Sequence, residues 1–441
     1  MSGRTLAEWL EWQQGAHPTT IDLGLDRVQR VLARLGWRGL PCPVLTVGGT
    51  NGKGSCVAFL EAMLDAAGYR VGTFTSPHLV RYNERIRVAR REASDAAIVA
   101  QFERIEAVRG AASLTFFEYN TLAALLLFEQ HDATAVVLEV GLGGRLDAVN
   151  VVSPDVAVVT SIGLDHCEWL GNDVESIGRE KAGIFRAGRP AIFGAREMPR
   201  SIAEQAEAIG APLWRLGRDY DFAVADGSWS WRSADLCYEN LPMPALAGAT
   251  QYANASAAIA ALACVRDRLP VPAEAIAAGL RAVELPGRFQ IVTGPVEWIL
   301  DVAHNPDGAA TLARHLASRP CDGRTLAVCG VLGDKDIAGI VTALGASIDA
   351  WYAAGLAGPR ALSAEQTADR LRAAGACVAA AADSVAAACV HAHRVAVPGD
   401  RVVVFGSFHT VGPALEWLAA RPLGDADGVA SPGDVVVRGG G

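Results

Sequence analysis

Residues 48–55 combine the residue types that bind phosphate groups. The segment reads Gly48-Gly49-Thr50-Asn51-Gly52-Lys53-Gly54-Ser55, and it lies between an apolar, β-branched run at 43–47 and a helical pattern from about 53 to 67. Glycines let backbone N–H groups turn toward phosphate oxygens, a helix start adds partial positive charge, and a lysine neutralises the outer phosphates. The spacing departs from the common GxxxxGKS/T pattern, because Val47 occupies the first glycine position and Gly54 precedes Ser55. The pattern predicts a triphosphate-binding loop, and a glycine-rich turn with an incidental lysine is the weaker alternative.

Three side chains that could hold a metal ion stand where expected strands end. Ser76 lies in TFTSPHL, Glu139 in VVLEVGLGG and His166 in SIGLDHCEWLG. Ligands bind at the carboxyl edge of open parallel sheets, so these side chains would meet the phosphate loop there. Magnesium prefers hard oxygen ligands and accepts an occasional nitrogen. Each residue also has a structural interpretation: Ser76 could cap a turn, Glu139 could be a paired buried acid, and His166 could be a hydrogen-bonded loop histidine.

Two further segments carry side chains that could bind a substrate. Arginines cluster between Arg81 and Arg87, with an alternation that suggests a short strand or loop. They could meet carboxylates or phosphates in a fork geometry or form a solvated charged loop. The adjacent aromatics Phe116 and Phe117 could stack a flat heterocycle or belong to the core. Lys181, in GREKAGIF, is on its own typical of a solvated helix lysine.

The elements that would position these residues alternate along the chain. Apolar runs at 135–140, 156–162 and 191–194 are separated by helical patterns, among them 117–130 and 175–185. Runs without strict polar alternation, separated by helices, predict an α/β fold with a mostly parallel sheet buried on both faces. The pattern breaks at the two prolines and two glycines of LPGRFQIVTGP, and strand and helix alternation then begins again. We therefore expect a domain boundary there.

Length and composition limit the classes of protein. The 441 residues exceed what one hydrophobic core usually organises, so two domains are expected. A composition of 51% hydrophobic and 20% charged residues indicates a globular protein, and a net charge of -9 argues against general nucleic-acid binding. Nine scattered cysteines without a CxxC pair fit neither a disulfide framework nor a zinc site, which favours a reducing cytoplasm. We see neither a signal peptide nor an apolar run long enough to span a membrane.

The ordered motifs of the chain resemble those of the folylpolyglutamate synthases, and more closely the bacterial bifunctional dihydrofolate synthase/folylpolyglutamate synthases of the Mur ligase superfamily. The resemblance rests on GTNGKGS, TSPHLVRYNERIRV, SLTFFEYNTLAALLLF, LEVGLGGRLDAVN, TSIGLDHCEWLG, ESIGREKAGIF, LPGRFQ, DVAHNP, LGDKDIAG and GSFHTV. These motifs extend over nearly the whole chain, to about Arg421. The phosphate loop alone is shared with Mur ligases and other users of ATP.

The resemblance implies a domain organisation and a set of site residues. An N-terminal P-loop ATPase domain with a mostly parallel sheet would span 1–287, followed by a linker at 288–295, a smaller C-terminal Rossmann-like α/β domain at 296–422 and a flexible tail at 423–441. Carried over by motif, the ATP-binding residues would be Thr50, Asn51, Gly52, Lys53, Gly54, Ser55, Asn254, Arg288 and Asp301. The magnesium ligands would be Ser76, Glu139 and His166. The pterin contacts would be Thr115, Phe116, Phe117, Glu118, Leu146, Asp147 and Ala148. Lys181 matches a position that carries a carbamylated lysine, and His304 would complete a catalytic set with Lys53, His166 and Lys181.

The implied activity is an ATP-dependent amide ligase that uses Mg2+ and adds L-glutamate to dihydropteroate and to reduced folates through an acyl phosphate. The resemblance also implies a cytoplasmic monomer without nucleic-acid or membrane partners. One alternative is a folylpolyglutamate synthase without the first activity, and another is a non-catalytic ATP-binding paralogue, against which the retained metal constellation argues. A Mur-type ligase acting on a nucleotide-linked sugar normally needs an N-terminal domain, whereas only about 45 residues precede this phosphate loop.

Overall fold

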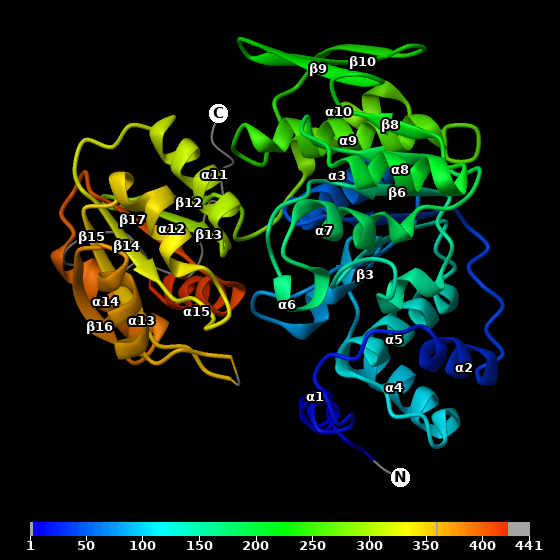
Figure 1. Ribbon diagram of the computed structural model, residues 1–441, viewed down its shortest axis with the longest axis horizontal. Coiled ribbons are helices and arrows are strands. Elements are labelled where there is room, and N and C mark those ends of the chain that lie inside the picture. Colours follow the sequence, from blue (N-terminus) through cyan, green and yellow to red (C-terminus); the bar gives the residue numbers. More distant parts are fainter. Residues whose placement is uncertain (1–2, 359, 422–441) are drawn as a thin grey trace. The chain divides into compact units, whose positions relative to one another are not determined.

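The structure is a computed structural model that describes residues 3–358 and 360–421 (Figure 1). Within these residues the chain forms two compact units, one made of 3–244 with 251–283 and the other of 245–250 with 284–421. The chain therefore passes between the units three times. The tail predicted at 423–441 lies outside the described residues.

The first unit is built on an eight-stranded sheet with the strand order β4-β3-β2-β5-β1-β6-β7-β8. The six strands from β2 to β8 in this order run parallel, and the edge strands β3 and β4 are antiparallel. Every residue of β1, β5, β6 and β7 is buried, which explains why their sequences are apolar without polar alternation. The strands are β1 Val44–Gly48, β2 Val71–Phe74, β3 Ile86–Val88, β4 Arg91–Glu92, β5 Ala135–Glu139, β6 Val156–Val159, β7 Ala191–Phe193 and β8 Leu213–Arg215.

Two helices of the first unit are apolar around most of their circumference. Residues 54–64 of α3 and 118–128 of α5 are buried without a break, as expected for helices enclosed by other elements rather than exposed on one side. The helices of this unit are α1 Leu6–Gln14, α2 Asp26–Arg34, α3 Lys53–Ala66, α4 Asp95–Arg109, α5 Phe116–Gln130, α6 Cys167–Leu170, α7 Val174–Lys181, α8 Arg200–Ile209, α9 Thr250–Cys264 and α10 Ala273–Ala282, with short 3-10 turns η1 Tyr82–Arg85, η2 Ala148–Val151 and η3 Ala182–Ile184. In the described part of the chain, no helix has both the length and the apolar character that a membrane span requires.

A three-stranded antiparallel meander completes the first unit and was not foreseen from the sequence. It consists of β9 Tyr220–Ala225, β10 Ser228–Ser233 and β11 Cys237–Leu241, with β10 in the centre. Trp229 and Trp231 alternate with serines along β10, and both indoles are buried. The indole N–H of Trp231 donates to the carbonyl of Ser256, 3.2 Å away, which fixes the meander to α9.

The second unit has a six-stranded sheet with the order β12-β13-β17-β14-β15-β16. All neighbouring pairs are parallel except the edge pair β12 and β13. The strands are β12 Gln290–Val292, β13 Glu297–Asp301, β14 Thr325–Cys329, β15 Ala350–Ala354, β16 Val378–Ala382 and β17 Arg401–Phe405, and the helices are α11 Pro306–Ala317, α12 Ile337–Leu344, α13 Ala364–Ala373, α14 Val385–Val395 and α15 Phe408–Ala419, with the turn η4 Gly345–Ser347. The predicted α/β fold class is thus confirmed in both units.

A buried histidine in the second unit lacks hydrogen-bond partners. His315 on α11 is 5% exposed, and neither ring nitrogen has a partner among the described residues. Its ring packs edge-on against Phe289, with centroids 5.0 Å apart, and a Cβ at Gly248 would lie 2.3 Å from its Cε1. Burial, and secondarily the charge of Arg314, lower the pKa of His315. The neutral imidazole is therefore the form that fits this place.

The buried imidazole predicts acid-sensitive stability. Because its pKa is lower in the folded than in the unfolded chain, the unfolded chain takes up the proton first, and the free energy of unfolding should fall as pH drops below about 6.5. His315→Leu should remove this component and raise stability at neutral pH by about 1 kcal/mol, since no hydrogen bond is lost. Urea unfolding at pH 7 and pH 5 would measure both effects. The exposed His393→Leu variant serves as the control, and an unchanged pH dependence in His315→Leu would refute the assignment.

Candidate active site

The phosphate loop joins β1 to α3 and is held in shape by the loop after β6. Gly49 has φ +139°, and a Cβ there would lie 2.0 Å from Oγ1 of Thr160, so only glycine fits. The Thr160 hydroxyl donates to the carbonyl of Asn51 at 2.7 Å, and the backbone N–H of Thr50 donates to the carbonyl of Ser161 at 2.8 Å. The second glycine of the Gly48-Gly49 pair therefore makes room for the neighbouring loop.

Asn254, predicted to contact the nucleotide, lies beside this loop. Gly52 adopts the left-handed conformation at φ +88° immediately before α3, and a Cβ there would lie 2.4 Å from Oδ1 of Asn254. The Asn254 amide in turn donates to Oε1 of Gln251 at 3.0 Å. Gly52 and Asn254, 202 positions apart in sequence, thus meet at the start of α3, where anions are favoured.

Ser76 and Glu139 follow neighbouring strands and are directly linked. The backbone N–H of Ser76, after β2, donates to Oε2 of Glu139, at the end of β5, over 3.0 Å. A hydroxyl and a carboxylate are hard oxygen donors, so this pair suits Mg2+. His166 follows β6 and has φ +53°, an uncommon conformation for a residue with a side chain. Among the residues that the structure describes, no three His, Cys, Asp or Glu side chains form a ready-made metal site, so the metal role of the three residues stays a prediction.

Lys181 is buried and reaches the phosphate loop, so its interpretation as a solvated helix lysine is wrong. It is 5% exposed, and its ammonium group donates to the carbonyl of Gly49 at 2.9 Å. Burial, followed by the charge of Lys53, lowers the pKa of Lys181 to about 7. The Lys53 ammonium donates to the same carbonyl and to that of Thr50, each at 3.1 Å. Two lysines therefore meet at one backbone oxygen.

The two predicted pterin-binding segments lie together in the first unit. The loop after β5 passes so close to Phe117 that a Cβ at Gly141 would lie 2.6 Å from its ring. Asp147 holds this loop by accepting the backbone N–H groups of Leu142 at 2.8 Å and Val149 at 3.0 Å. Burial raises the pKa of Asp147 to about 6. Its carboxyl group is thus committed to shaping the loop that carries Leu146 and Ala148.

Glu118 likewise forms hydrogen bonds within the protein, and its partner Arg27 was not predicted from the sequence. Thr115 and Glu118 form a reciprocal cap at the start of α5, with the Thr115 N–H 2.7 Å from Oε2 of Glu118. Arg27 donates to Glu118 at 3.0 Å and to Asp22 at 2.6 Å. The N–H of Gly24 also donates to the carbonyl of Leu146 at 3.2 Å. Residues 22–27 therefore border the predicted pterin site, although they carry no motif of their own.

Of the site residues predicted in the second unit, Asp301 is the last residue of β13, His304 follows this strand, and Arg288 precedes β12. The carboxylate of Asp301 accepts the backbone N–H groups of Phe289 and Ala303, each at 2.8 Å. Burial raises the pKa of Asp301, and the positive charge of Arg288 opposes this. His304 lies three residues further along, with Nδ1 2.8 Å from the carbonyl of Val302.

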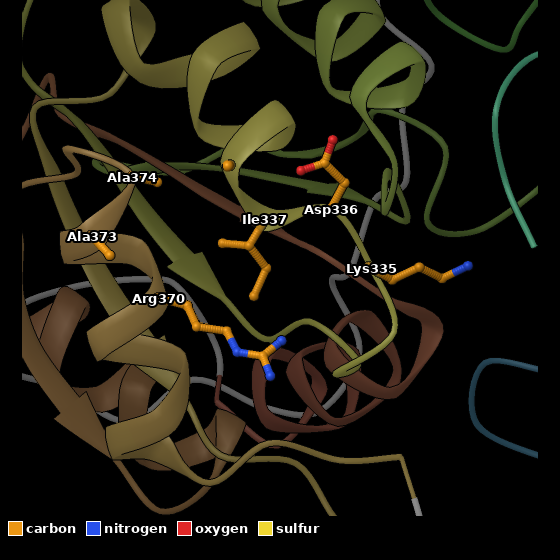
Figure 2. A pocket seen from close by; sticks show the side chains of 7 residues that line it. Lys335, Asp336, Ile337, Arg370, Ala373 and Ala374 are labelled. Carbon is orange, nitrogen blue, oxygen red and sulfur yellow. The ribbon is translucent and has the colours of Figure 1, made fainter. Parts of the chain in front are cut away.

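A pocket of about 330 Å³ in the second unit involves none of the predicted site residues (Figure 2). It lies between the start of α12 and the end of α13, and the Arg370 side chain reaches across it toward Ile337. The guanidinium of Arg370 donates to the carbonyl of Gly333 at 2.9 Å. The residues that line this pocket are Lys335, Asp336, Ile337, Ala338, Arg370, Ala373 and Ala374.

Comparisons with known proteins agree with this arrangement. The family described as Mur ligase middle domain matches residues 47–262, and the family described as Mur ligase, glutamate ligase domain, matches residues 287–408. The dihydrofolate synthase/folylpolyglutamate synthase of Escherichia coli (strain K12) is 50% identical over 420 residues, which cover 95% of this chain and 97% of the relative.

Solved structures resemble the chain over the same length. E. coli FolC in complex with DHPP and ADP has a TM-score of 0.90 at 50% identity, covering 95% of this chain and 98% of that one. The bifunctional folylpolyglutamate synthase/dihydrofolate synthase of Yersinia pestis, complexed with AMPPNP and a Mn ion, has a TM-score of 0.87 at 47% identity, covering 94% and 98%. The fold and the phosphate loop thus define an ATP-dependent ligase of the Mur type. Within that class, the chain belongs to the dihydrofolate synthase/folylpolyglutamate synthase family, as its motifs predicted.

The contact between Gly52 and Asn254 predicts that the two glycines bordering α3 differ in importance. Gly52 and Gly68 have nearly equal φ angles, +88° and +86°, but only Gly68 has open space where a Cβ would lie. Gly68→Ala should cost about 1–2 kcal/mol of stability from backbone strain and leave nucleotide affinity unchanged. Gly52→Ala should carry the same strain, displace Asn254 and weaken ATP binding at least about tenfold, or 1.4 kcal/mol. Calorimetric titration with Mg-AMPPNP would compare them, and equal affinities in both variants would contradict the role given to Asn254.

Proposed function

We propose that this chain adds L-glutamate to dihydropteroate, forming dihydrofolate, and to reduced folates, forming folylpolyglutamates. The observation that carries the proposal is the phosphate loop on which two lysines converge, in a chain whose motifs match this family over nearly its full length. The first unit also holds a half-buried aromatic pair suited to a flat ring, and a carboxylate suited to a metal ion at the end of β5, the strand that pairs with β1.

The chemistry follows from the inertness of a carboxylate toward amines. A carboxylate oxygen of the pteroate or folate attacks the γ-phosphorus of ATP, the bond between that phosphorus and the β,γ-bridging oxygen breaks, and ADP leaves. The glutamate amine then attacks the carbonyl carbon of the acyl phosphate, phosphate leaves, and the amine gives up a proton. Lys53 and the backbone N–H groups of residues 50–55 stabilise charge on the transferring phosphoryl group.

The remaining roles follow the family motifs. Asn254, Arg288 and Asp301 contact the nucleotide, and His304 is a neighbour of the reacting groups. Ser76, Glu139 and His166 hold Mg2+, which when bound offsets charge on the phosphates. The pterin lies against Thr115, Phe116, Phe117, Glu118, Leu146, Asp147 and Ala148.

The proposal extends to organisation and location. The predicted N-terminal domain at 1–287 corresponds to the first unit except for 245–250 and 284–287, which belong to the second, and the predicted linker at 288–295 contains β12 of the second sheet, before the C-terminal domain predicted at 296–422. In this proposal the protein is a cytoplasmic monomer that works on small molecules.

Lys181 is suited to carbamylation, as the family position implies. A carbamate forms when a neutral amine attacks carbon dioxide, and a lysine with a pKa of about 7 supplies that amine near neutral pH. The modification also replaces one of two neighbouring cations by an anion, which removes the repulsion between Lys181 and Lys53 and adds an oxygen donor near the phosphate loop.

Product analysis tests the proposed activity. The protein is incubated with Mg-ATP and glutamate, with dihydropteroate in one sample and a reduced monoglutamyl folate in the other, and products are weighed by mass spectrometry. We expect one glutamate added to dihydropteroate and one or more to the folate. Lys53→Ala should keep the fold and lose ADP release. Addition only to the folate would reduce the activity to a folylpolyglutamate synthase, and no addition in either sample would favour the non-catalytic alternative.

Carbamylation predicts a dependence on carbon dioxide and pH. Because the reacting amine must be neutral, occupancy should rise as pH increases through about 7. In ¹³C-bicarbonate, the wild-type protein should show a carbamate carbon resonance that is missing from Lys181→Gln, and buffer freed of carbon dioxide should lower the rate reversibly. A resonance that persists in Lys181→Gln, or a rate indifferent to carbon dioxide, would exclude the modification.

A further inference from the structure

Arg85 is a buried cation in the first unit, and the proposed mechanism assigns it no role. It ends the turn η1, is 8% exposed, and donates from Nε to Nδ1 of His78 at 2.8 Å. Its guanidinium carbon lies 5.4 Å from the ring centre of Phe116 and 5.8 Å from that of Tyr82. Arg85 therefore borders the aromatic pair at the start of α5.

The two terminal nitrogens of Arg85 have no acceptor within the described residues, in contrast to the arginines around it. Arg81 pairs with Glu92 and Arg87 pairs with Glu61. The carboxylate of Glu84, although close in sequence, accepts three backbone N–H groups, those of residues 79, 80 and 81. The terminal nitrogens of Arg85 are not fully enclosed by protein atoms either, so each is accessible from solvent. They are available to an incoming anion.

The charge of Arg85 lies near two parts of the proposed site. Burial lowers the pKa of Arg85, and the negative charges of Glu139 and Glu84 oppose this, so Arg85 is within electrostatic reach of Glu139. It also lies against the ring of Phe116. Dihydropteroate brings matching groups: a flat pterin, an aromatic ring and a carboxylate that must reach the γ-phosphate.

We propose that Arg85 binds the carboxylate of the pteroate or folate substrate and holds it for attack on ATP. The inference rests on the proposed function and deepens it. A guanidinium fork matches a carboxylate and leaves a lone pair on one oxygen free to attack the phosphorus. The positive charge also reduces the repulsion between this carboxylate and the triphosphate, two anions that must come within bonding distance.

A pair of ligands separates this role from a structural one. The probes are dihydropteroate and its analogue with hydrogen in place of the carboxylate. Each is titrated into the protein by calorimetry under anaerobic conditions in the presence of Mg-ADP. The wild-type protein should bind the analogue about 10- to 100-fold more weakly than dihydropteroate. Arg85→Gln should bind dihydropteroate as weakly as the analogue, with unchanged affinity for the analogue and for ADP. Arg85→Lys, which keeps the charge without the fork, should retain part of the discrimination.

The exposed Arg81→Gln variant is the matched control and should behave as wild type. If Arg85→Gln weakens both ligands equally, Arg85 only supports the fold and the inference is wrong. If it weakens Mg-AMPPNP instead, the anion is the γ-phosphate and the inference is also wrong. Full discrimination in Arg85→Lys together with an unfolded Arg85→Gln would show that charge alone suffices and would overturn the fork. A wild-type chain that binds no dihydropteroate overturns the proposed function itself. A wild-type chain that adds glutamate but binds dihydropteroate and the analogue with equal affinity overturns this inference alone.

Discussion

The carbonyl oxygen of Gly49 accepts hydrogen bonds from the ammonium groups of Lys53 and Lys181. Several elements of the first unit are needed to bring these three residues together. Lys53 begins α3, Lys181 ends α7, and the carbonyl itself is turned by a glycine that no other residue can replace because Thr160 fills the space of its Cβ. Two cations at one oxygen repel each other, and burial increases the cost. The site therefore favours partners that bring negative charge, which the phosphates of ATP do.

The sequence was informative wherever burial dictates composition. The parallel strands are enclosed on both faces, so their apolar runs marked them, and the pattern at 117–130 became α5 at Phe116–Gln130. The phosphate loop was recognisable because its glycines and lysine act within eight residues. The meander β9–β11 was missed because at least half of the residues of β9 and of β11 are exposed, and the period of two in SWSWRS extends over too few residues to stand out from a loop.

The site residues show the opposite limit. Strand ends located Ser76 and Glu139 correctly at one edge of the sheet, since that depends only on topology. Which partner a charged side chain meets depends on tertiary contacts that sequence spacing does not contain: Arg27 and Glu118 are 91 residues apart. For the same reason Lys181 resembled a solvated helix lysine, because α7 has charged neighbours in sequence whereas its last turn is covered by the loops after β1 and β5.

Charge pairing separates the cations that build the fold from those left for ligands. Within the described part of the first unit, the half-buried Arg27 and Arg87 are paired with carboxylates, as such charges usually are. Lys181 and Arg85 are more deeply buried than these two arginines, yet their hydrogen bonds go to a carbonyl oxygen and an imidazole nitrogen. A chain of net charge -9 has carboxylates enough to pair both. Their separation from those carboxylates leaves both groups buried without a negative partner among the described residues, a free-energy cost that the proposed carbamate at Lys181 and the proposed substrate carboxylate at Arg85 would each remove.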